Sequence, residues 1–313
     1  MKRQMINRET VEGRLYQHNL EMKTVQNKES KNFGKDFISG TIDIATDEDG
    51  LNVVPIHFTY VVEMTNGGKK NVTFGVLKSI IDGAKCWVTD GKDAALKVRV
   101  STALALNDFY VKEGDEDRLV SAKRNEGGFV NIIKDLSPEP ERNRFDCDMI
   151  ITGVTPVEVE DGDDYIRVRG AIFNFRADLL PIEFTAHDPG AIDYFEKLDA
   201  SASNPVFTEV RGAIVNNAIK QNIEEESAFG TVSVRTITRN VKEWVIDWAR
   251  PTEYDFGAED TITADELRTA MQNREVYLAE IKKRRDEYAA SRAAATTPDS
   301  AATSAIPEGS FNF

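Results

Sequence analysis

One segment of the chain interleaves guanidinium and aromatic side chains. From 165 to 175 the residues alternate with the period of a β-strand, and Ile166, Val168 and Ile172 form its apolar face. The opposite face combines rings with positive charge: Tyr165, Arg167, Arg169, Phe173 and Phe175. Such rings stack on bases at about 1–3 kcal/mol each while arginine follows the phosphates, so this strand is predicted to bind single-stranded nucleic acid.

The same residue types recur elsewhere in the chain. Those in the first hundred residues are Arg14, Tyr16, Lys23, Lys35, Phe37, Lys97 and Arg99. Lys97 and Arg99 stand two residues apart and would share one face of a strand. Arg235 and Arg239 share parity on a later strand and would extend the surface of the 165–175 segment. These residues complete the predicted binding set.

A structural role would also explain these residues. The rings of Phe37, Phe173 and Phe175 would then pack under helices or between domains, and the arginines would pair with the many carboxylates of the chain. Trp244 and Trp248 share parity beside apolar neighbours, so we expect them to seal a domain surface.

No motif of a familiar enzyme is present. The sequence lacks a nucleophile elbow, a phosphate-binding Gly-x-x-x-x-Gly-Lys loop and a His-Glu-x-x-His motif. The three histidines lie far apart, and Cys86 and Cys147 lack Cys-x-x-Cys spacing. Residues 47–50 and 161–164 are acidic but have no calcium ligand ladder, so we interpret them as turns. We expect no cofactor, no metal and no enzymatic activity.

The composition describes a globular protein with an uneven charge distribution. The chain has 313 residues, 41% of them hydrophobic, which allows about two domains with cores. The formal net charge of −14 argues against a protein that coats duplex DNA, although residues 1–40 hold an excess of basic residues. No run of about 20 apolar residues occurs. We expect a soluble protein of the cytoplasm.

A segment that occurs twice indicates a duplicated β domain. Gly-x-Ile at 40–42 leads to Pro-Ile-x-Phe-Thr at 55–59, and the same pattern returns at 170–172 and 181–185. Each copy continues with a short helix and further strands. The sequence therefore predicts a mainly β fold with two tandem OB-like five-stranded barrels, each with a short helix, followed by a long helix and a disordered tail.

The domain boundaries follow from changes in composition. We predict a first barrel at 1–134, a linker at 135–146, a second barrel at 147–256, a long amphipathic helix at 257–292 and a disordered tail at 293–313. Thr263 and Glu266 form a capping box at the start of the helix. Residues 113–128 are rich in acids and glycine and are expected to form a long loop.

The segments 10–15, 37–44, 53–58 and 306–313 carry a resemblance to a known family. They resemble the OB-fold single-stranded-DNA-binding proteins of replication, in the tandem-barrel form encoded by tailed bacteriophages. This resemblance places the chain in the host cytoplasm if a phage encodes it. It implies that strands and loops of the barrels hold the DNA, and that Glu308, Phe311 and Phe313 of the tail dock onto replication proteins. The tail departs from the family, since it has a single acid in its last eight residues.

Three functions follow as alternatives. The leading hypothesis is binding of single-stranded DNA with little sequence preference, to protect or organise it in phage replication or recombination. The second is a non-enzymatic assembly scaffold, in which the 263–292 helix mediates formation of a homo-oligomer. The third is a nuclease that uses acids such as Asp161, Asp163 and Asp164.

Overall fold

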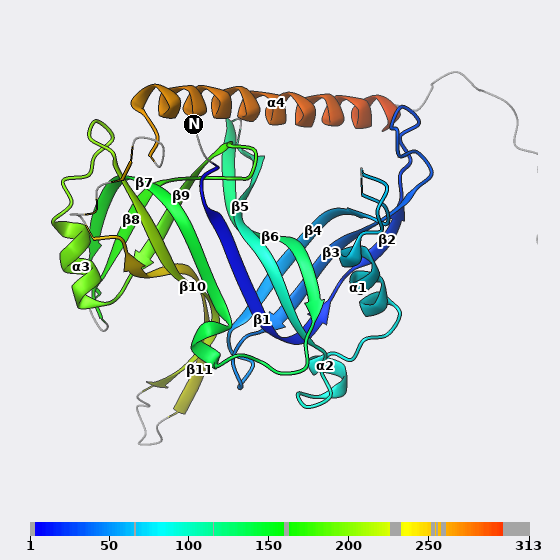
Figure 1. Ribbon diagram of the computed structural model, residues 1–313, viewed down its shortest axis with the longest axis horizontal. Coiled ribbons are helices and arrows are strands. Elements are labelled where there is room, and N and C mark those ends of the chain that lie inside the picture. The colour runs from blue at the N-terminus through cyan, green and yellow to red at the C-terminus, as the bar shows by residue number, and fades with distance from the viewer. Residues whose placement is uncertain are drawn as a thin grey trace, which may run out of the picture.

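The protein consists of two strand-rich bodies beside each other under one long helix, as the computed structural model shows (Figure 1). The structure describes residues 4–65, 67–114, 116–159, 163–225, 233–251, 254, 256–257 and 261–296. Side chains within 218–225, 233–240 and 291–296, and that of Ala264, are outside the description.

Five strands of the first half close into a barrel. They are β1 (Asn7–His18), β3 (Asp36–Ala45), β4 (Val53–Val62), β5 (Lys97–Glu113) and β6 (Glu116–Ile132). β1 pairs with β3 and β5, β3 with β4, and β5 with β6, all antiparallel, and β6 closes on β4 in parallel. The helix α1 (Val72–Ile81) joins β4 to β5, and the short β2 (Glu21–Thr24) and α2 (Trp87–Asp90) are additions.

Five strands of the second half close in the same way. They are β7 (Asn143–Val157), β8 (Tyr165–Phe173), β9 (Leu179–Ala186), β10 (Val206–Glu225) and β11 (Ser233–Ala249). β7 pairs with β8 and β10, β8 with β9, and β10 with β11, and β11 closes on β9 in parallel. The helix α3 (Pro189–Glu196) occupies the place that α1 has in the first barrel.

The two barrels therefore share one topology. In each, the strands lie in the order first, second, third, fifth, fourth and back to the first, with the helix between the third and fourth strands. This is the arrangement of an OB-like barrel, and the predicted mainly β fold with two such units is confirmed.

The repeated glycine has the same task in both barrels. A Cβ on Gly170 would lie 2.0 Å from the carbonyl oxygen of Ile150 on β7, and one on Gly40 would lie 2.6 Å from that of Asn19, just after β1. Gly40 also has a φ of +133°, which favours glycine. Each glycine lets the second strand of its barrel cross close to the first.

Gly170→Ala is expected to lower the free energy of unfolding by about 1–3 kcal/mol, because the added methyl group overpacks against backbone that cannot move aside. Gly75→Ala is the matched control, since Gly75 lies in α1 with nothing within 4 Å of the new methyl group. The control should gain about 0.5–1 kcal/mol. Urea unfolding of both variants checks this, and an unchanged midpoint for Gly170→Ala would contradict it.

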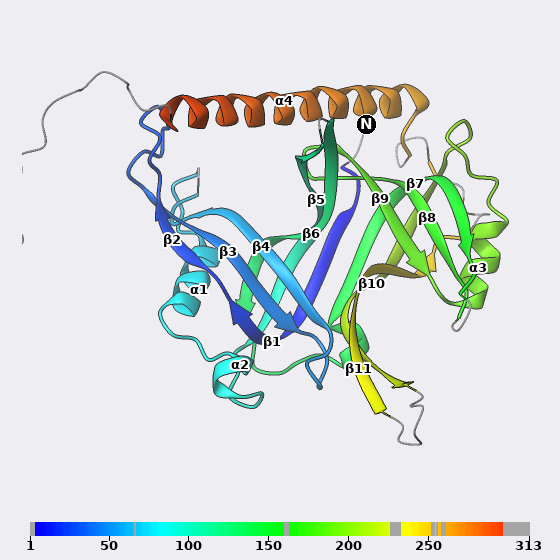
Figure 2. The ribbon, with the colours of Figure 1, turned by 180° about the vertical axis from the view of Figure 1, so that it is seen from behind.

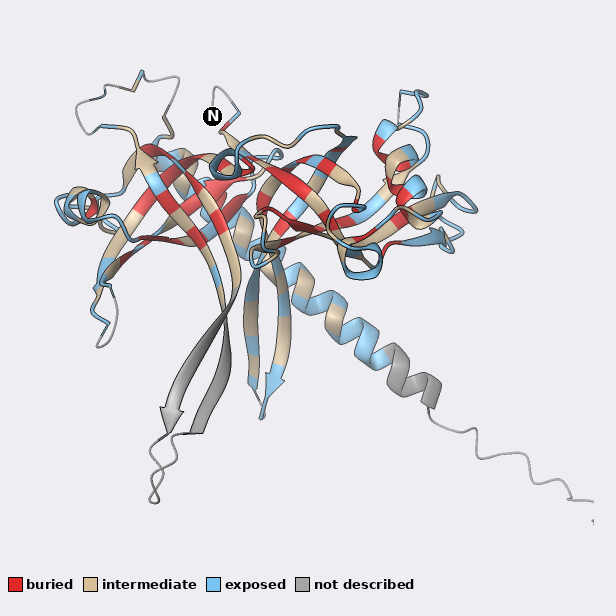
Figure 3. Ribbon diagram, turned by 90° about the horizontal axis from the view of Figure 1, so that it is seen from below, coloured by how far each residue is buried: buried red, intermediate tan, exposed pale blue. Residues whose placement is uncertain are grey.

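The two barrels are joined by backbone hydrogen bonding. Residues 7–11 of β1 pair with residues 143–147 of β7, so the described strands form one continuous sheet. Most of their buried side chains form one cluster, which includes Val11 and Leu15 from the first barrel and Phe145 and Val168 from the second. Figure 3 shows this buried stripe crossing both barrels.

A carboxyl group is buried at this junction. Glu9 pairs with Thr102 on one side and Phe145 on the other, and its Oε2 accepts a hydrogen bond of 2.5 Å from Thr102 Oγ1. Its Oε1 has no partner among the described residues. Burial raises the pKa of Glu9 from 4.5 to about 8, against a smaller lowering by the Thr102 hydrogen bond.

This burial predicts a pH dependence of stability. Between pH 4.5 and about 8 the folded chain retains the Glu9 proton while the unfolded chain releases it, so the unfolding free energy should fall as pH rises. Glu9→Gln should reduce that fall, whereas Glu21→Gln on β2, an exposed residue, should leave it unchanged. Urea unfolding at several pH values measures the difference. Parallel curves for wild type and Glu9→Gln would contradict the prediction.

The long helix α4 (Ala264–Thr296) crosses above both barrels (Figures 1 and 2). The predicted capping box begins it, because Thr263 Oγ1 accepts from the Glu266 amide at 3.2 Å and the Glu266 carboxylate accepts from the Thr263 amide at 2.9 Å. Ala270 then packs with Ile150 and Phe173 of the second barrel.

Further along, α4 holds the β5–β6 hairpin of the first barrel. Lys282 Nζ lies 3.2 Å and Arg285 Nη2 2.8 Å from the Asp117 carboxylate on β6. The helix thus connects the second barrel to this hairpin. Met271 and Val276 are exposed on α4, and its role in self-association stays a prediction.

The β5–β6 hairpin corrects one expectation. The predicted loop at 113–128 is instead most of β6, paired with β5 almost to its tip. The hairpin protrudes from the barrel, so most side chains of β6 meet solvent and the strand has no continuous apolar face. Its acids and glycines therefore gave the sequence the character of a loop. Within 135–146 the structure has a 3-10 turn (Glu139–Glu141) and the start of β7 at Asn143, and the domain boundaries themselves stay predictions.

Candidate nucleic-acid interface

The outer side of β8 presents Tyr165, Arg167 and Arg169, which we call the β8 face. Ile166 and Val168 between them are fully buried, so the alternation predicted from the sequence is present. Arg167 Nη2 donates to Tyr165 Oη at 3.2 Å, and Arg169 Nη2 donates to Thr155 Oγ1 at 3.1 Å. Within the described part of the chain, neither guanidinium group has a carboxylate within salt-bridge distance.

Aromatic and acidic neighbours complete the β8 face. The Tyr165 ring stacks on His187 with 5.1 Å between centroids. The Tyr165 hydroxyl and then the charge of Glu183 raise the pKa of Arg167. Glu183 stands opposite Arg169 on β9. The face therefore offers two charged guanidinium groups beside a stacked ring pair.

A second polar surface lies where the first barrel meets β11. Its members come from β3, β4, β6 and β11, and we call it the inter-barrel face: Thr41, His57, Thr59, Arg124 and Lys242. Thr41 Oγ1 lies 3.0 Å from His57 Nδ1, and Arg124 Nη2 donates to Thr59 Oγ1 at 2.8 Å. Thr41, His57 and Thr59 lie on the outer sides of β3 and β4, the second and third strands of their barrel, where OB folds commonly bind oligonucleotides.

Positive charge converges on His57. Burial lowers the pKa of His57, the Arg124 guanidinium lowers it further, Asp43 raises it, and Lys242 lowers it again. The imidazole therefore faces cations from β6 and from β11, two strands that belong to different barrels. A phosphate group placed here would meet attraction from both.

Lys123, next to Arg124 on β6, points to the other side of that strand and reaches the second barrel. Its ammonium lies 5.1 Å from the centroid of the Trp244 ring on β11. Desolvation lowers the pKa of Lys123, while the carboxylates of Glu183 and Glu243 raise it. Since Glu183 also stands opposite Arg169, Lys123 lies near the β8 face.

Several predicted residues of the first barrel make structural contacts instead of forming one surface. Arg14 is largely covered and lies 3.8 Å from Glu48. Lys97 Nζ donates to the Lys134 carbonyl at 3.0 Å. Arg99 pairs at 2.6 Å with the buried carboxylate of Glu12. Desolvation raises the pKa of Glu12, but the hydrogen bonds from Ser137 and Arg99 together lower it by more.

The other predicted residues of this barrel lie near β2 and α2. Lys23 stands opposite Phe37 and pairs with Glu21 at 3.1 Å. The centroid of the Phe37 ring lies 4.8 Å from that of the Tyr60 ring. Tyr60 was not among the residues predicted from the sequence. Lys35 Nζ donates to Asn32 Oδ1 at 3.1 Å, and the Tyr16 ring lies 6.0 Å from Trp87.

Phe173 does not belong to the exposed surface, and its predicted exposure is wrong. Only 2% of it is exposed, because α4 and Leu179 cover this end of β8. Phe175, just beyond the strand, is 73% exposed, and the Arg176 guanidinium lies 5.1 Å from its ring centroid. The face predicted from one strand therefore ends at Arg169.

Five predicted residues cannot be placed. The side chains of Arg235 and Arg239, and the tail residues Glu308, Phe311 and Phe313, lie outside the described residues. The sequence analysis in turn missed Lys123, Arg124 and Lys242. The first two fall in the segment that was expected to be a loop, and only the barrel pairing brings Lys242 near β4.

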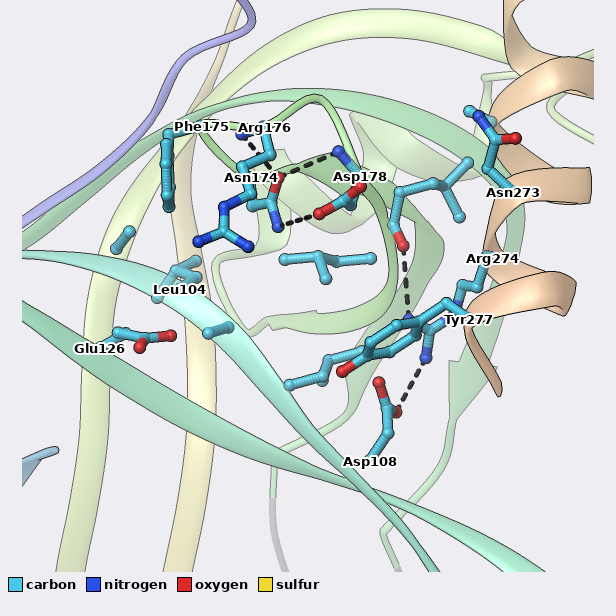
Figure 4. A pocket seen from close by; sticks show the side chains of 16 residues that line it. Leu104, Asp108, Glu126, Asn174, Phe175, Arg176, Asp178, Asn273, Arg274 and Tyr277 are labelled. Carbon is cyan, nitrogen blue, oxygen red and sulfur yellow. Dashed lines mark hydrogen bonds and ion pairs between the residues drawn. The ribbon is translucent and has the colours of Figure 1, made fainter. Parts of the chain in front are cut away.

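A cavity of about 240 Å³ lies under α4, between the β5–β6 hairpin and the turn after β8 (Figure 4). Arg274 on α4 closes one side, with Nη2 2.8 Å from the buried carboxylate of Asp108. Asn174 Nδ2 donates to Asp178 Oδ2 at 2.9 Å in the turn. Leu104 and Leu180 give the lining an apolar part. The cavity belongs to the attachment of α4 to both barrels.

Neither a metal site nor a membrane-spanning helix is found among the described residues. Among them, no three His, Cys, Asp or Glu side chains gather as a metal site would require. None of their helices has the length and apolar character needed to cross a bilayer.

The topology and these faces define a protein of two OB-like barrels with a polar, partly basic surface between them. A family model described as YorF matches residues 6–284, so the chain belongs to the YorF family. A comparison with curated proteins found no match. Among solved structures, the chain is similar to a deletion mutant of the single-stranded DNA binding protein from Thermus aquaticus, at 12% identity and a TM-score of 0.46. That alignment covers 82% of this chain and 98% of the other.

The contrast between Phe173 and Phe175 gives a test of this description. Phe173→Ala should lower the unfolding free energy by about 3–5 kcal/mol, because it leaves a cavity under α4. Phe175→Ala should change it by less than about 0.5 kcal/mol, since its ring meets solvent. Urea unfolding followed by circular dichroism measures both. Equal effects of the two variants would contradict the burial described here.

Proposed function

We propose that the protein binds single-stranded DNA with little sequence preference, through the β8 face and the inter-barrel face. The observation that carries the proposal is the pair Arg167 and Arg169, exposed on an OB strand beside Tyr165 and without carboxylate partners among the described residues. Two such guanidinium groups attract the phosphates, and the ring offers a base a stacking surface.

The inter-barrel face supports the same function. Arg124 and Lys242 come from strands of different barrels and lie beside a threonine and histidine surface. Hydroxyl and imidazole groups can bind phosphate or base edges without selecting one base. Contacts of this kind favour a strand of any sequence over a defined motif.

The acidic balance of the chain is compatible with this proposal. The net charge of −14 would oppose DNA over most of the surface, so binding would be confined to local basic faces. Three acids lie near these faces, Glu183, Glu243 and Asp43. Of these, Glu243 is held at 2.8 Å by His187 and at 3.0 Å by Thr185.

We propose further that the protein protects or organises single strands during DNA replication or recombination, and that it acts without catalysis. A bacteriophage setting and docking of replication proteins by Glu308, Phe311 and Phe313 follow from the sequence resemblance alone. Both are parts of the proposal.

Titration of fluorescently labelled oligo-dT tests the binding. Wild type should bind at about 50 mM salt and lose affinity as salt rises, because bound phosphates release counterions. The double variant Arg167→Ala/Arg169→Ala should bind roughly tenfold or more weakly, with a salt slope smaller by about 1.4, two contacts at about 0.7 each.

The control variant also removes two arginines, but from a different surface. Arg268 and Arg284 are exposed on α4, each with its own carboxylate at 2.8 and 3.2 Å, so Arg268→Ala/Arg284→Ala should bind as wild type does. Absence of wild-type binding at low salt would refute the proposed function. Equal losses in both double variants would refute the assignment of the β8 face.

A further inference from the structure

A further surface of charged and aromatic side chains, distinct from the β8 face and the inter-barrel face, lies on the outside of the junction between the barrels. Arg8 on β1 stands opposite Asp146 on β7, Asp146 opposite Arg211 on β10, and Arg211 opposite Trp248 on β11. We call these four residues the junction row. Neighbouring strands lie about 4.8 Å apart, so the row spans roughly 14 Å across both barrels.

The row points away from the shared core. Its neighbours along the strands, Phe145, Cys147 and Val210, are buried in that core, whereas Arg8 has 71% of its side chain exposed. A β-bulge between Arg211 and Gly212 leaves Asp247 as an extra residue on β11. This register shift places Trp248 beside Arg211, although Trp244 and Ile246 on the same strand are buried.

Guanidinium groups outnumber carboxylates in and around the row. Asp146 is shared, with Arg8 Nη2 at 2.7 Å and Arg211 Nε at 3.9 Å. Glu209 is also shared, between Arg211 at 2.8 Å and Arg250. Together with the Arg144–Asp247 pair, four arginines here have three carboxylates.

The arginines and rings alternate in space. The Arg211 guanidinium lies 4.3 Å and that of Arg250 5.1 Å from the Trp248 ring centroid. Arg250 also lies 4.7 Å from the ring of Tyr254, which is half exposed. The carboxylates and rings hold the guanidinium groups in place, so little side-chain entropy is lost when a ligand binds them.

A hollow of about 310 Å³ opens beside the row. Arg8, Arg144 and Arg211 line it together with Glu9, Thr10, Phe145 and Asp146, and burial raises the pKa of Glu9 to about 8, so that its carboxyl group is mostly protonated at pH 7. Three guanidinium groups from three strands thus surround one open space. Guanidinium forks match the oxygens of a phosphate group, which is the ligand chemistry this hollow fits best.

We propose that the junction row is a second contact surface for the phosphodiester backbone of single-stranded DNA, engaged by strands long enough to reach it from the inter-barrel face. This inference rests on the proposed function. A short strand occupies the inter-barrel and β8 faces alone, and a longer one adds the junction row.

The experiment compares two lengths of labelled oligo-dT. One of about 10 nucleotides fits a single OB fold, and one of about 40 exceeds what two such folds occlude. Arg8→Gln/Arg211→Gln should bind the short strand as wild type does. It should bind the long strand roughly tenfold more weakly, with a salt slope smaller by about 1.4 for two lost phosphate contacts.

Two further variants separate charge from structure. Arg8→Lys/Arg211→Lys retains both charges and should keep the wild-type salt slope on the long strand. Arg268→Gln/Arg284→Gln on α4 removes two exposed guanidinium groups elsewhere and should bind both lengths as wild type does.

Each outcome has a definite meaning. Wild-type binding of the long strand by Arg8→Gln/Arg211→Gln would overturn the second surface and leave the proposed function standing. An equal loss on both lengths would place the row inside the primary site and also overturn it. Wild type that binds neither length would refute the proposed function, and the junction row with it.

Discussion

The hydrogen-bonded ladder between β1 and β7 is the constraint on which the rest of the structure depends. It fuses two barrels of the same topology into one sheet and merges their apolar side chains into one core. Because of it, β11 approaches β4, so that Lys242 and Arg124 reach the same histidine. The inter-barrel face, the junction row and the span covered by α4 all presuppose this pairing.

Much of the fold could be predicted from the sequence because its signals are local. Alternation in 165–169 identified the exposed Arg167 and Arg169, and the repeated glycine identified the duplication, since each copy needs close backbone crossing. Phe173 continued the same alternation and yet is buried. The helix that covers it begins some ninety residues later, and no pattern within the strand records that contact.

The surfaces proposed to bind DNA were harder to predict for a related reason. Lys123 and Arg124 lie on a hairpin whose exposed side chains do not alternate between apolar and polar. The sequence of this segment therefore predicted a loop. The junction row has members on four strands from both barrels, and each residue looks ordinary in its own segment. Such sites arise from register between strands, which depends on long-range pairing and a bulge.

The fusion at β1 and β7 also affects which strands would fit the protein. Barrels joined by a flexible linker adjust their spacing to the ligand, whereas here a backbone ladder fixes it. Under the proposed function, a nucleic acid that touches both barrels would have to follow the path between them that this ladder fixes. Strands that unstack easily, such as pyrimidine runs, would bend to that path at lower cost than stacked purine runs, which would give a preference based on stiffness and independent of base edges.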